Sequence, residues 1–165
     1  MASSTGHTTA APRELVFSRI FDAPRALMWT AWTDPAHVAR WWGPNGVTNP
    51  VCALDLRPGG AIRVDMRGAD GSVSSMAGVF HDIVEPERLV FTTNAFADSE
   101  GHPQLAVLNT VTFAEHDGKT TVTLHAVIVT SSPTVAASVA GMEEGWTQSL
   151  DRLADYLGYV QGEER

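Results

Sequence analysis

The sequence of 165 residues has a single cysteine, Cys52, and few basic side chains: 11 lysines and arginines stand against 19 acidic residues. One cysteine cannot form an internal disulfide or supply a cysteine metal cluster, and it is compatible with a reducing compartment. The formal net charge of −8 argues against general affinity for nucleic acid or an anionic membrane, because both require a basic surface. We therefore expect neither nucleic acid nor membrane as a partner.

The chain also lacks a long hydrophobic run. No segment approaches the roughly 20 apolar residues that span a bilayer. Residues 1–12 are rich in Ser, Thr, Ala and Gly, without the basic segment and apolar core of a secretion signal. We interpret residues 1–12 as a disordered N-terminal tail and expect a cytoplasmic location.

Sequence motifs for common catalytic chemistry are missing as well. The six histidines show no HxH, HExxH or Cys/His spacing, so no metal site is expected. There is no phosphate-binding loop of the Walker or dinucleotide type and no Gly-x-Ser-x-Gly nucleophile elbow. Cys52 lies in an apolar segment and is interpreted as a small buried residue rather than a nucleophile. We expect no cofactor, and the chain is less typical of an enzyme than of a binding protein.

What is present fits one globular domain. Apolar residues make up 44% of the chain and charged residues 18%, which is ordinary for a soluble domain of this length. We predict a single domain over residues 13–160, followed by a short C-terminal tail over residues 161–165.

The longest pattern is helical and covers residues 132–160. Ser132 and Pro133 form a suitable N-cap and first-turn pair. Apolar residues then recur every three or four positions, as on one face of an α-helix. They are Val135, Val139, Met142, Trp146, Leu150, Leu153 and Leu157. A helix with such a stripe must bury it against another element.

Nearly everything upstream indicates strands. Two short helices are predicted over residues 25–32 and 35–42, each with a proline near its start. Strands are predicted over residues 14–21, 51–56, 61–67, 73–84, 89–93, 105–115 and 119–130. The Asp-Gly pairs at 70–71 and 117–118 are hairpin turns, which predicts an antiparallel sheet. Gly78, inside a strand, is interpreted as a bulge or bend, and the charged residues of 61–67 are expected to face outward.

Several motifs occur in a familiar order and spacing. They occupy residues 21–25, 31–35, 40–44, 55–60, 78–80, 86–92, 145–146 and 150–157. Together they resemble the bacterial homologues of the activator of the Hsp90 chaperone ATPase, within the SRPBCC (START/Bet v 1-like) superfamily, over residues 13–158. The resemblance implies an α+β helix-grip fold, in which a curved antiparallel sheet wraps around the long C-terminal helix and two short helices follow the first strand. It does not imply that bacterial members activate a chaperone.

We expect a cavity between the sheet and the helix, because a curved sheet gripping one helix often leaves a gap. The candidate ligand-binding residues are large apolar side chains on these elements, although each suits a plain core equally well. They are Trp41, Trp42, Met66, Met76, Phe80, Phe91, Phe113, Met142 and Trp146. The adjacent tryptophans cannot both face the same way, so one is expected to anchor the short helix and the other to line the cavity mouth.

Glu143 is the one weak catalytic candidate. It is one position round from Met142 on the helix and would act as an acid or base if its carboxylate pointed to the cavity rim; the alternative is a solvated face. Gly141 and Gly145 flank this segment and indicate either a close approach to the sheet or a kink.

The leading functional hypothesis is binding of a small hydrophobic or aromatic molecule in this cavity. Alternatives are an enzyme of the polyketide cyclase or hydrolase kind using the same cavity, and a co-chaperone that stimulates a heat-shock chaperone ATPase. A chaperone partner is disfavoured because the chain lacks the additional N-terminal domain of the eukaryotic activators. The exposed sheet edges are compatible with a homodimer.

Overall fold

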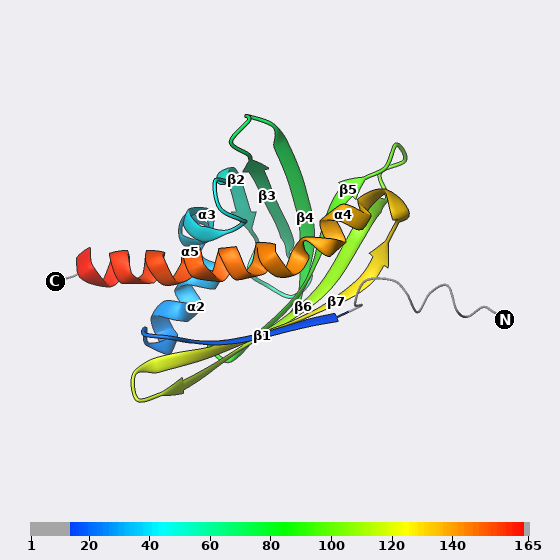
Figure 1. The fold of residues 1–165 in the computed structure, drawn as a ribbon. Coiled ribbons are helices and arrows are strands. Elements are labelled where there is room, and N and C mark those ends of the chain that lie inside the picture. The colour runs from blue at the N-terminus through cyan, green and yellow to red at the C-terminus, as the bar shows by residue number, and fades with distance from the viewer. Residues whose placement is uncertain (1–13, 164–165) are drawn as a thin grey trace.

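The computed structural model describes residues 14–163, in which one antiparallel sheet packs against helices (Figure 1). The elements in chain order are β1 (Glu14–Phe21), α2 (Arg25–Thr33), α3 (Pro35–Trp41), β2 (Thr48–Leu54), β3 (Ala61–Arg67), β4 (Val73–Val84), β5 (Arg88–Ala97), β6 (Pro103–His116), β7 (Lys119–Ser131), the 3₁₀ turn η1 (Pro133–Val135), α4 (Ala136–Ala140) and α5 (Met142–Glu163). Each predicted strand and short helix is present, with ends that differ by a few residues.

The seven strands lie in the order β1-β7-β6-β5-β4-β3-β2, and all pairs are antiparallel. Strands β2 to β7 pair with their neighbours in sequence, whereas β1 pairs with the last strand, Phe17 lying opposite Leu124. The two edge strands are therefore β1 and β2, and α2 and α3 lead the chain from one edge to the other. Helix α5 lies across one face of the curved sheet (Figure 1), which confirms the predicted helix-grip fold.

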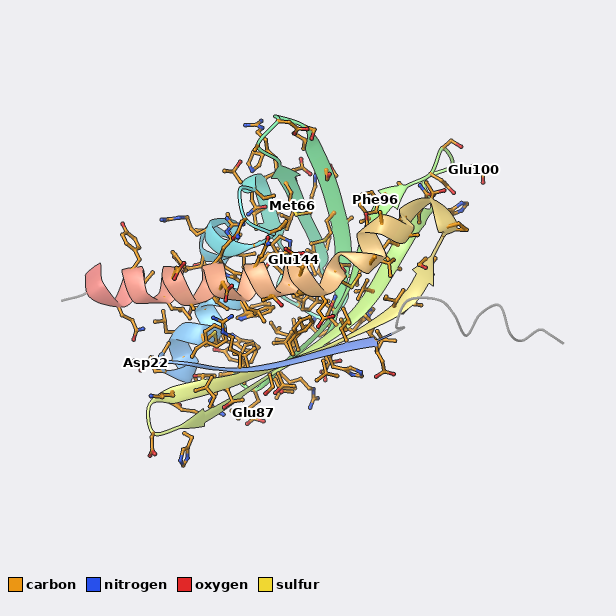
Figure 2. All side chains as sticks on the ribbon, in the orientation of Figure 1. Asp22, Met66, Glu87, Phe96, Glu100 and Glu144 are labelled. Carbon is orange, nitrogen blue, oxygen red and sulfur yellow. The ribbon has the colours of Figure 1, made fainter. Side chains whose placement is uncertain are left out.

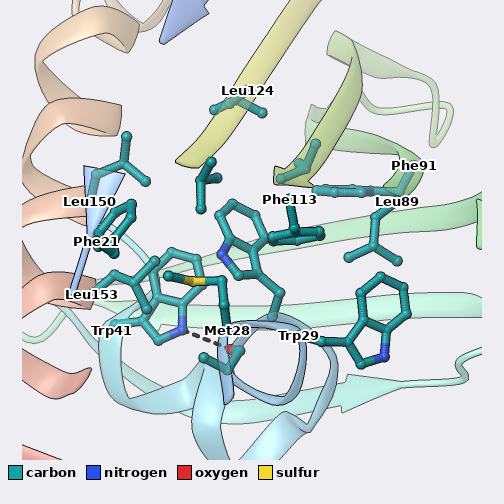
Figure 3. Packing of buried hydrophobic residues seen from close by; sticks show 14 of the residues in the cluster. Phe21, Met28, Trp29, Trp41, Leu89, Phe91, Phe113, Leu124, Leu150 and Leu153 are labelled. Atoms are coloured by element: carbon teal, nitrogen blue, oxygen red, sulfur yellow. Dashed lines mark hydrogen bonds between the residues drawn. The ribbon is translucent and has the colours of Figure 1, made fainter. Parts of the chain in front are cut away.

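The hydrophobic core lies between the sheet and the helices (Figure 3). Leu150, Leu153 and Leu157 of α5 are buried to within 3% exposure, as the helical stripe predicts. They join one cluster with inward-facing residues of the strands and with the aromatic side chains of α2 and α3. Burial of these side chains stabilises the helix on the sheet, at about 1.5–3 kcal/mol for each large residue.

The C-terminal helix differs from the prediction at both ends. The expected continuous helix over residues 132–160 is wrong at Gly141, where φ of −88° and ψ of 0° end α4 before α5 begins. A bend is thus present at the first of the two glycines. Ser132 makes no side-chain cap; its hydroxyl instead donates to Gln104 Oε1 at 2.9 Å. Helix α5 continues to Glu163, so residues 161–163 of the predicted tail are helical.

Two strand predictions need correction. The register shift between β4 and β5 falls between Phe80 and Asp82, not at Gly78. A Cβ atom on Gly78 would lie 2.1 Å from the carbonyl oxygen of Thr92, so this glycine permits a close approach of two backbones. Asp65, expected to face solvent, is only 8% exposed, because the guanidinium of Arg63 binds its carboxylate at 3.1 Å.

The predicted disordered tail over residues 1–12 lies outside the described residues. Within residues 14–163, no helix is both long enough and apolar enough to cross a membrane.

Candidate functional site

An apolar cavity of about 190 Å³ lies between the sheet and the start of α5. Strands β3 to β6 form its floor, while the loop after α3 and the first turns of α5 form its walls; the side chains on these elements are drawn in Figure 2. Its lining residues are Trp42, Gly43, Pro44, Met66, Met76, Thr93, Leu105, Val107, Asn109, Met142, Gly145, Trp146 and Ser149.

The structure brings together five of the nine predicted ligand-binding residues. These five line the cavity and come from four separate elements or loops: Trp42, Met66, Met76, Met142 and Trp146. Their spacing along the sequence ranges from four residues to more than a hundred, so only the fold assembles them. The helical pair Met142 and Trp146 shares a face, as predicted.

The other four predicted residues belong to the core. Phe80 and Phe91 surround a second, inner cavity of about 20 Å³, whose lining shares Trp42 and Met76 with the first. Phe113 packs edge-on against Trp29, with ring centroids 5.7 Å apart. Trp41 and Phe113 line neither of these two cavities, and their assignment as ligand contacts stays a prediction.

The adjacent tryptophans separate because α3 ends between them. Trp41 is the last helical residue, is fully buried and donates from Nε1 to the carbonyl oxygen of Ala31 at 2.9 Å (Figure 3). Trp42 follows with extended backbone angles, φ −62° and ψ 136°, which turn its ring toward α5. There it meets Trp146 edge-on, with centroids 5.4 Å apart and planes at 80°. One tryptophan thus anchors the helix and the other lines the cavity, as expected.

Arg152 of α5 holds the loop that forms one wall. Its Nη1 atom donates to the carbonyl oxygens of Trp42, Gly43 and Pro44 at 2.8–3.1 Å, and Nη2 donates to that of Val47 at 3.0 Å. Partial burial lowers the pKa of this guanidinium below its usual value. The positive charge is bound by the partial negative charges of main-chain carbonyl groups, which ties the loop to the helix.

Three polar side chains in the lining were not among the sequence-predicted residues: Thr93, Asn109 and Ser149. Asn109 is 1% exposed and lies between the buried Val107 and Val111 positions of β6. A polar residue on the apolar face of an alternating strand is the signal that could have revealed it.

The hydrogen bonds of Asn109 are incomplete. Its Nδ2 atom donates to Phe91 O, Thr93 Oγ1 and Val107 O at 3.3–3.4 Å, which are long contacts. Its Oδ1 atom is buried and has no partner within residues 14–163. A buried carbonyl oxygen left unpaired costs about 1–3 kcal/mol.

Glu143 does not contribute to the site. Its side chain is exposed and is not part of the cavity lining, so the structure favours the solvated alternative. Histidines at the sheet surface make other contacts: His125 binds Glu14 at 2.8 Å and His81 binds Thr92 at 2.6 Å. Within the described part of the chain, no group of three or more His, Cys, Asp or Glu side chains is arranged to hold a metal ion.

Comparison with known protein families shows which family the chain belongs to. Residues 22–158 match the model of the family described as "Activator of Hsp90 ATPase homolog 1-like protein". The chain belongs to this family. A comparison with curated proteins gave no match.

Solved structures of similar proteins agree with the family. A protein from Arthrobacter aurescens shares 25% identity with a TM-score of 0.77, over 89% of this chain and 87% of that one. A protein from Mycobacterium smegmatis shares 28% identity with a TM-score of 0.72, over 87% and 89%. The AHSA1 protein from Silicibacter pomeroyi has the same fold at 23% identity, with a TM-score of 0.72 over 89% and 99%. Membership of the family and its SRPBCC superfamily is thereby confirmed.

The remaining expectations are not decided by these observations. The cytoplasmic location, the homodimer and the low expectation of a chaperone partner stay predictions, as do the boundaries of the domain.

Proposed function

We propose that this protein binds a small apolar or aromatic molecule in the cavity between the sheet and α5. The observation that carries the proposal is the character of the lining. It joins two tryptophans and three methionines around a space of about 190 Å³, and none of its residues is ionisable. Ligand sites are typically concave and apolar, with a small number of polar groups, and this cavity has that composition.

The volume shows how large a group the cavity can hold. An apolar protein cavity of about 150 Å³ accommodates benzene. A cavity of about 190 Å³ therefore suits a molecule with a single ring. Aromatic side chains give flat surfaces for such a ring, while the unbranched methionine side chains adapt to its outline.

The same lining favours binding over catalysis. Acid–base or nucleophilic chemistry requires a carboxylate, imidazole, amine or activated hydroxyl or thiol positioned at the substrate. Thr93 and Ser149 are the two hydroxyl residues of the lining, and the lining contains no carboxylate, imidazole or amine that could act as their base. The proposal is accordingly a carrier or sensor function rather than a cyclase or hydrolase.

Methyl NMR tests the proposal directly. The protein with ¹³C-labelled methionine methyl groups is titrated with p-cresol and p-xylene, two single-ring probes. Met66, Met76 and Met142 line the cavity and are expected to shift on saturation. Met28 lies in the core, fully buried, and is expected to stay in place, which makes it an internal reference.

A glycine in the cavity wall provides the blocking variant. Gly145 lines the cavity, and a Cβ atom built there meets no atom within 4 Å, so Gly145→Phe should fill the space without a clash at Cβ and abolish binding. Gly158→Phe is the matched control, because Gly158 lies in the same helix, is exposed and also has open space at Cβ. Shifts confined to Met28, or equal binding by the Gly145→Phe variant, would disprove the proposed site.

A further inference from the structure

Asn109 lines the cavity, and its side-chain oxygen has no hydrogen-bond partner among the described residues. It lies on the floor, 1% exposed, on a strand whose neighbouring inward positions are apolar. Proteins rarely retain a buried polar atom without a partner, and those that remain call for an explanation. A ligand that supplies the missing hydrogen bond is such an explanation.

The neighbours of Asn109 define which of its two polar atoms needs a partner. Phe91 O and Val107 O can only accept hydrogen bonds, and both lie 3.3–3.4 Å from Nδ2. They fix the amide with its NH₂ group toward the backbone, because a carbonyl oxygen placed there would face two acceptors. Oδ1 is consequently the atom without a partner among the described residues, and it can only accept.

The lining of the cavity sets the charge of the ligand. The lining contains no ionisable side chain that could balance an ion. Burying an unpaired ion in an apolar site is far more costly than burying a neutral hydroxyl or N–H group that finds a partner. The donor should therefore belong to a neutral molecule.

We propose that the cavity selects a neutral, single-ring molecule that carries one hydroxyl or N–H donor, and that Oδ1 of Asn109 accepts this hydrogen bond. The inference rests on the proposed function and adds the chemical class of the ligand. Oδ1 has less than 1 Å² accessible to solvent, so the donor reaches it when a neighbouring side chain moves aside. Among the lining residues, Met66, Met76 and Met142 have the flexible, unbranched side chains that permit such a movement.

The test compares p-cresol with p-xylene, in which a methyl group replaces the hydroxyl at nearly the same shape. Dissociation constants for both are measured on the wild type and on Asn109→Leu. For each protein, the dissociation constant of p-cresol is divided by that of p-xylene, and the two ratios are compared. The free energy of removing each probe from water is the same for both proteins, so it cancels in this comparison. Asn109→Leu is expected to weaken p-cresol about tenfold relative to p-xylene, as loss of one buried hydrogen bond does.

A second measurement needs no variant. In the wild type, the side-chain carbonyl ¹³C signal of Asn109 should shift with p-cresol and much less with p-xylene. If the ratio is unchanged in Asn109→Leu, or the Asn109 signal responds alike to both probes, the role of Asn109 is wrong while the binding site stands. If neither probe binds to the wild type, the proposed function fails, and the inference fails with it.

Discussion

At the scale of single residues, Cys52 should be a poor nucleophile. Burial raises the pKa of its thiol to about 11, with a smaller contribution from the negative charge of Asp34. At pH 8 the thiolate, which is the reactive form, is then about one part in a thousand, against roughly a quarter for a cysteine in an unfolded chain. We expect DTNB to modify the native protein at least 100-fold more slowly than the protein unfolded in guanidinium chloride. Cys52 is half-buried rather than fully buried as expected, and equal rates would show that this partial burial does not protect its thiol.

For the two adjacent tryptophans, the sequence predicts that they diverge but not which of them lines the cavity. That they diverge follows from their adjacency, but which of them lines the cavity depends on the residue at which α3 ends. The backbone leaves helical angles at Trp42, and this single change turns its ring to Trp146 while Trp41 stays in the core. Asn109 was not among the predicted residues, because these were large apolar side chains and Asn109 is an amide on the apolar face of its strand.

At the scale of elements, the contact between Arg152 and the loop after α3 should be a major support of the cavity wall. Arg152→Met removes hydrogen bonds to four carbonyl oxygens while retaining an apolar side chain. Hydrogen bonds to a charged group each contribute about 1.5–3 kcal/mol, and several on one group are not additive. We expect the free energy of unfolding to fall by about 2 kcal/mol, measured by urea denaturation monitored by circular dichroism.

Arg19→Met is the matched control for this measurement. Arg19 also pairs with α5, through Asp151 at 2.6 Å, but this ion pair is substantially exposed. Exposed pairs contribute about 0–1 kcal/mol, so the control should change stability little. Equal effects of the two substitutions would show that Arg152 acts as an ordinary surface cation.

Elements with a clear period were predicted well, whereas single glycines left two alternatives open, of which the kink is found at Gly141. The strand predicted over residues 119–130 is present as β7, in which every second residue from Thr120 to Ile128 is buried. In contrast, a helical stripe cannot show whether a glycine interrupts it, because Val139 before the bend at Gly141 and Met142 after it keep the three-residue spacing. Gly78 likewise indicated an irregular backbone, yet only the register shows that it relieves a close approach to Thr92.

At the scale of the whole molecule, the antiparallel sheet followed from its hairpins, and the grip on the helix followed from the family resemblance. The pairing of β1 with β7 joins residues more than a hundred positions apart, such as Phe17 and Leu124, and local turn signals contain no information about it. The size of the cavity is a small difference between the space enclosed by the sheet and the volume of the side chains that fill it. No pattern in the sequence fixes that difference.

The stability of the whole fold should decline at acid pH through three aspartates. The pKa of Asp65 is lowered by a hydrogen bond from Arg63 and, to a smaller extent, by one from Ser75. Hydrogen bonds from Ser72 lower the pKa of Asp70, and a hydrogen bond from the backbone N–H of His102 lowers the pKa of Asp98. A lowered native pKa means that the unfolded chain binds the proton more tightly. The stabilisation is therefore complete above the unfolded value, near pH 4, and is lost as the pH falls through the native value.

Asp65→Asn should make this acid response smaller, because the amide has no carboxylate to protonate. Its melting temperature is expected to be below that of the wild type at pH 7, where the bond from Arg63 to the carboxylate is lost, and to approach the wild type near pH 3. Asp22→Asn, at an exposed position, removes the same charge without removing any of these three contacts. Thermal melts of the three proteins between pH 7 and pH 3 provide the comparison. If the melting temperatures of both variants run parallel to those of the wild type, the Arg63–Asp65 pair does not contribute to acid sensitivity. If the melting temperature of Asp22→Asn approaches the wild-type value near pH 3 as that of Asp65→Asn does, the effect is one of net charge.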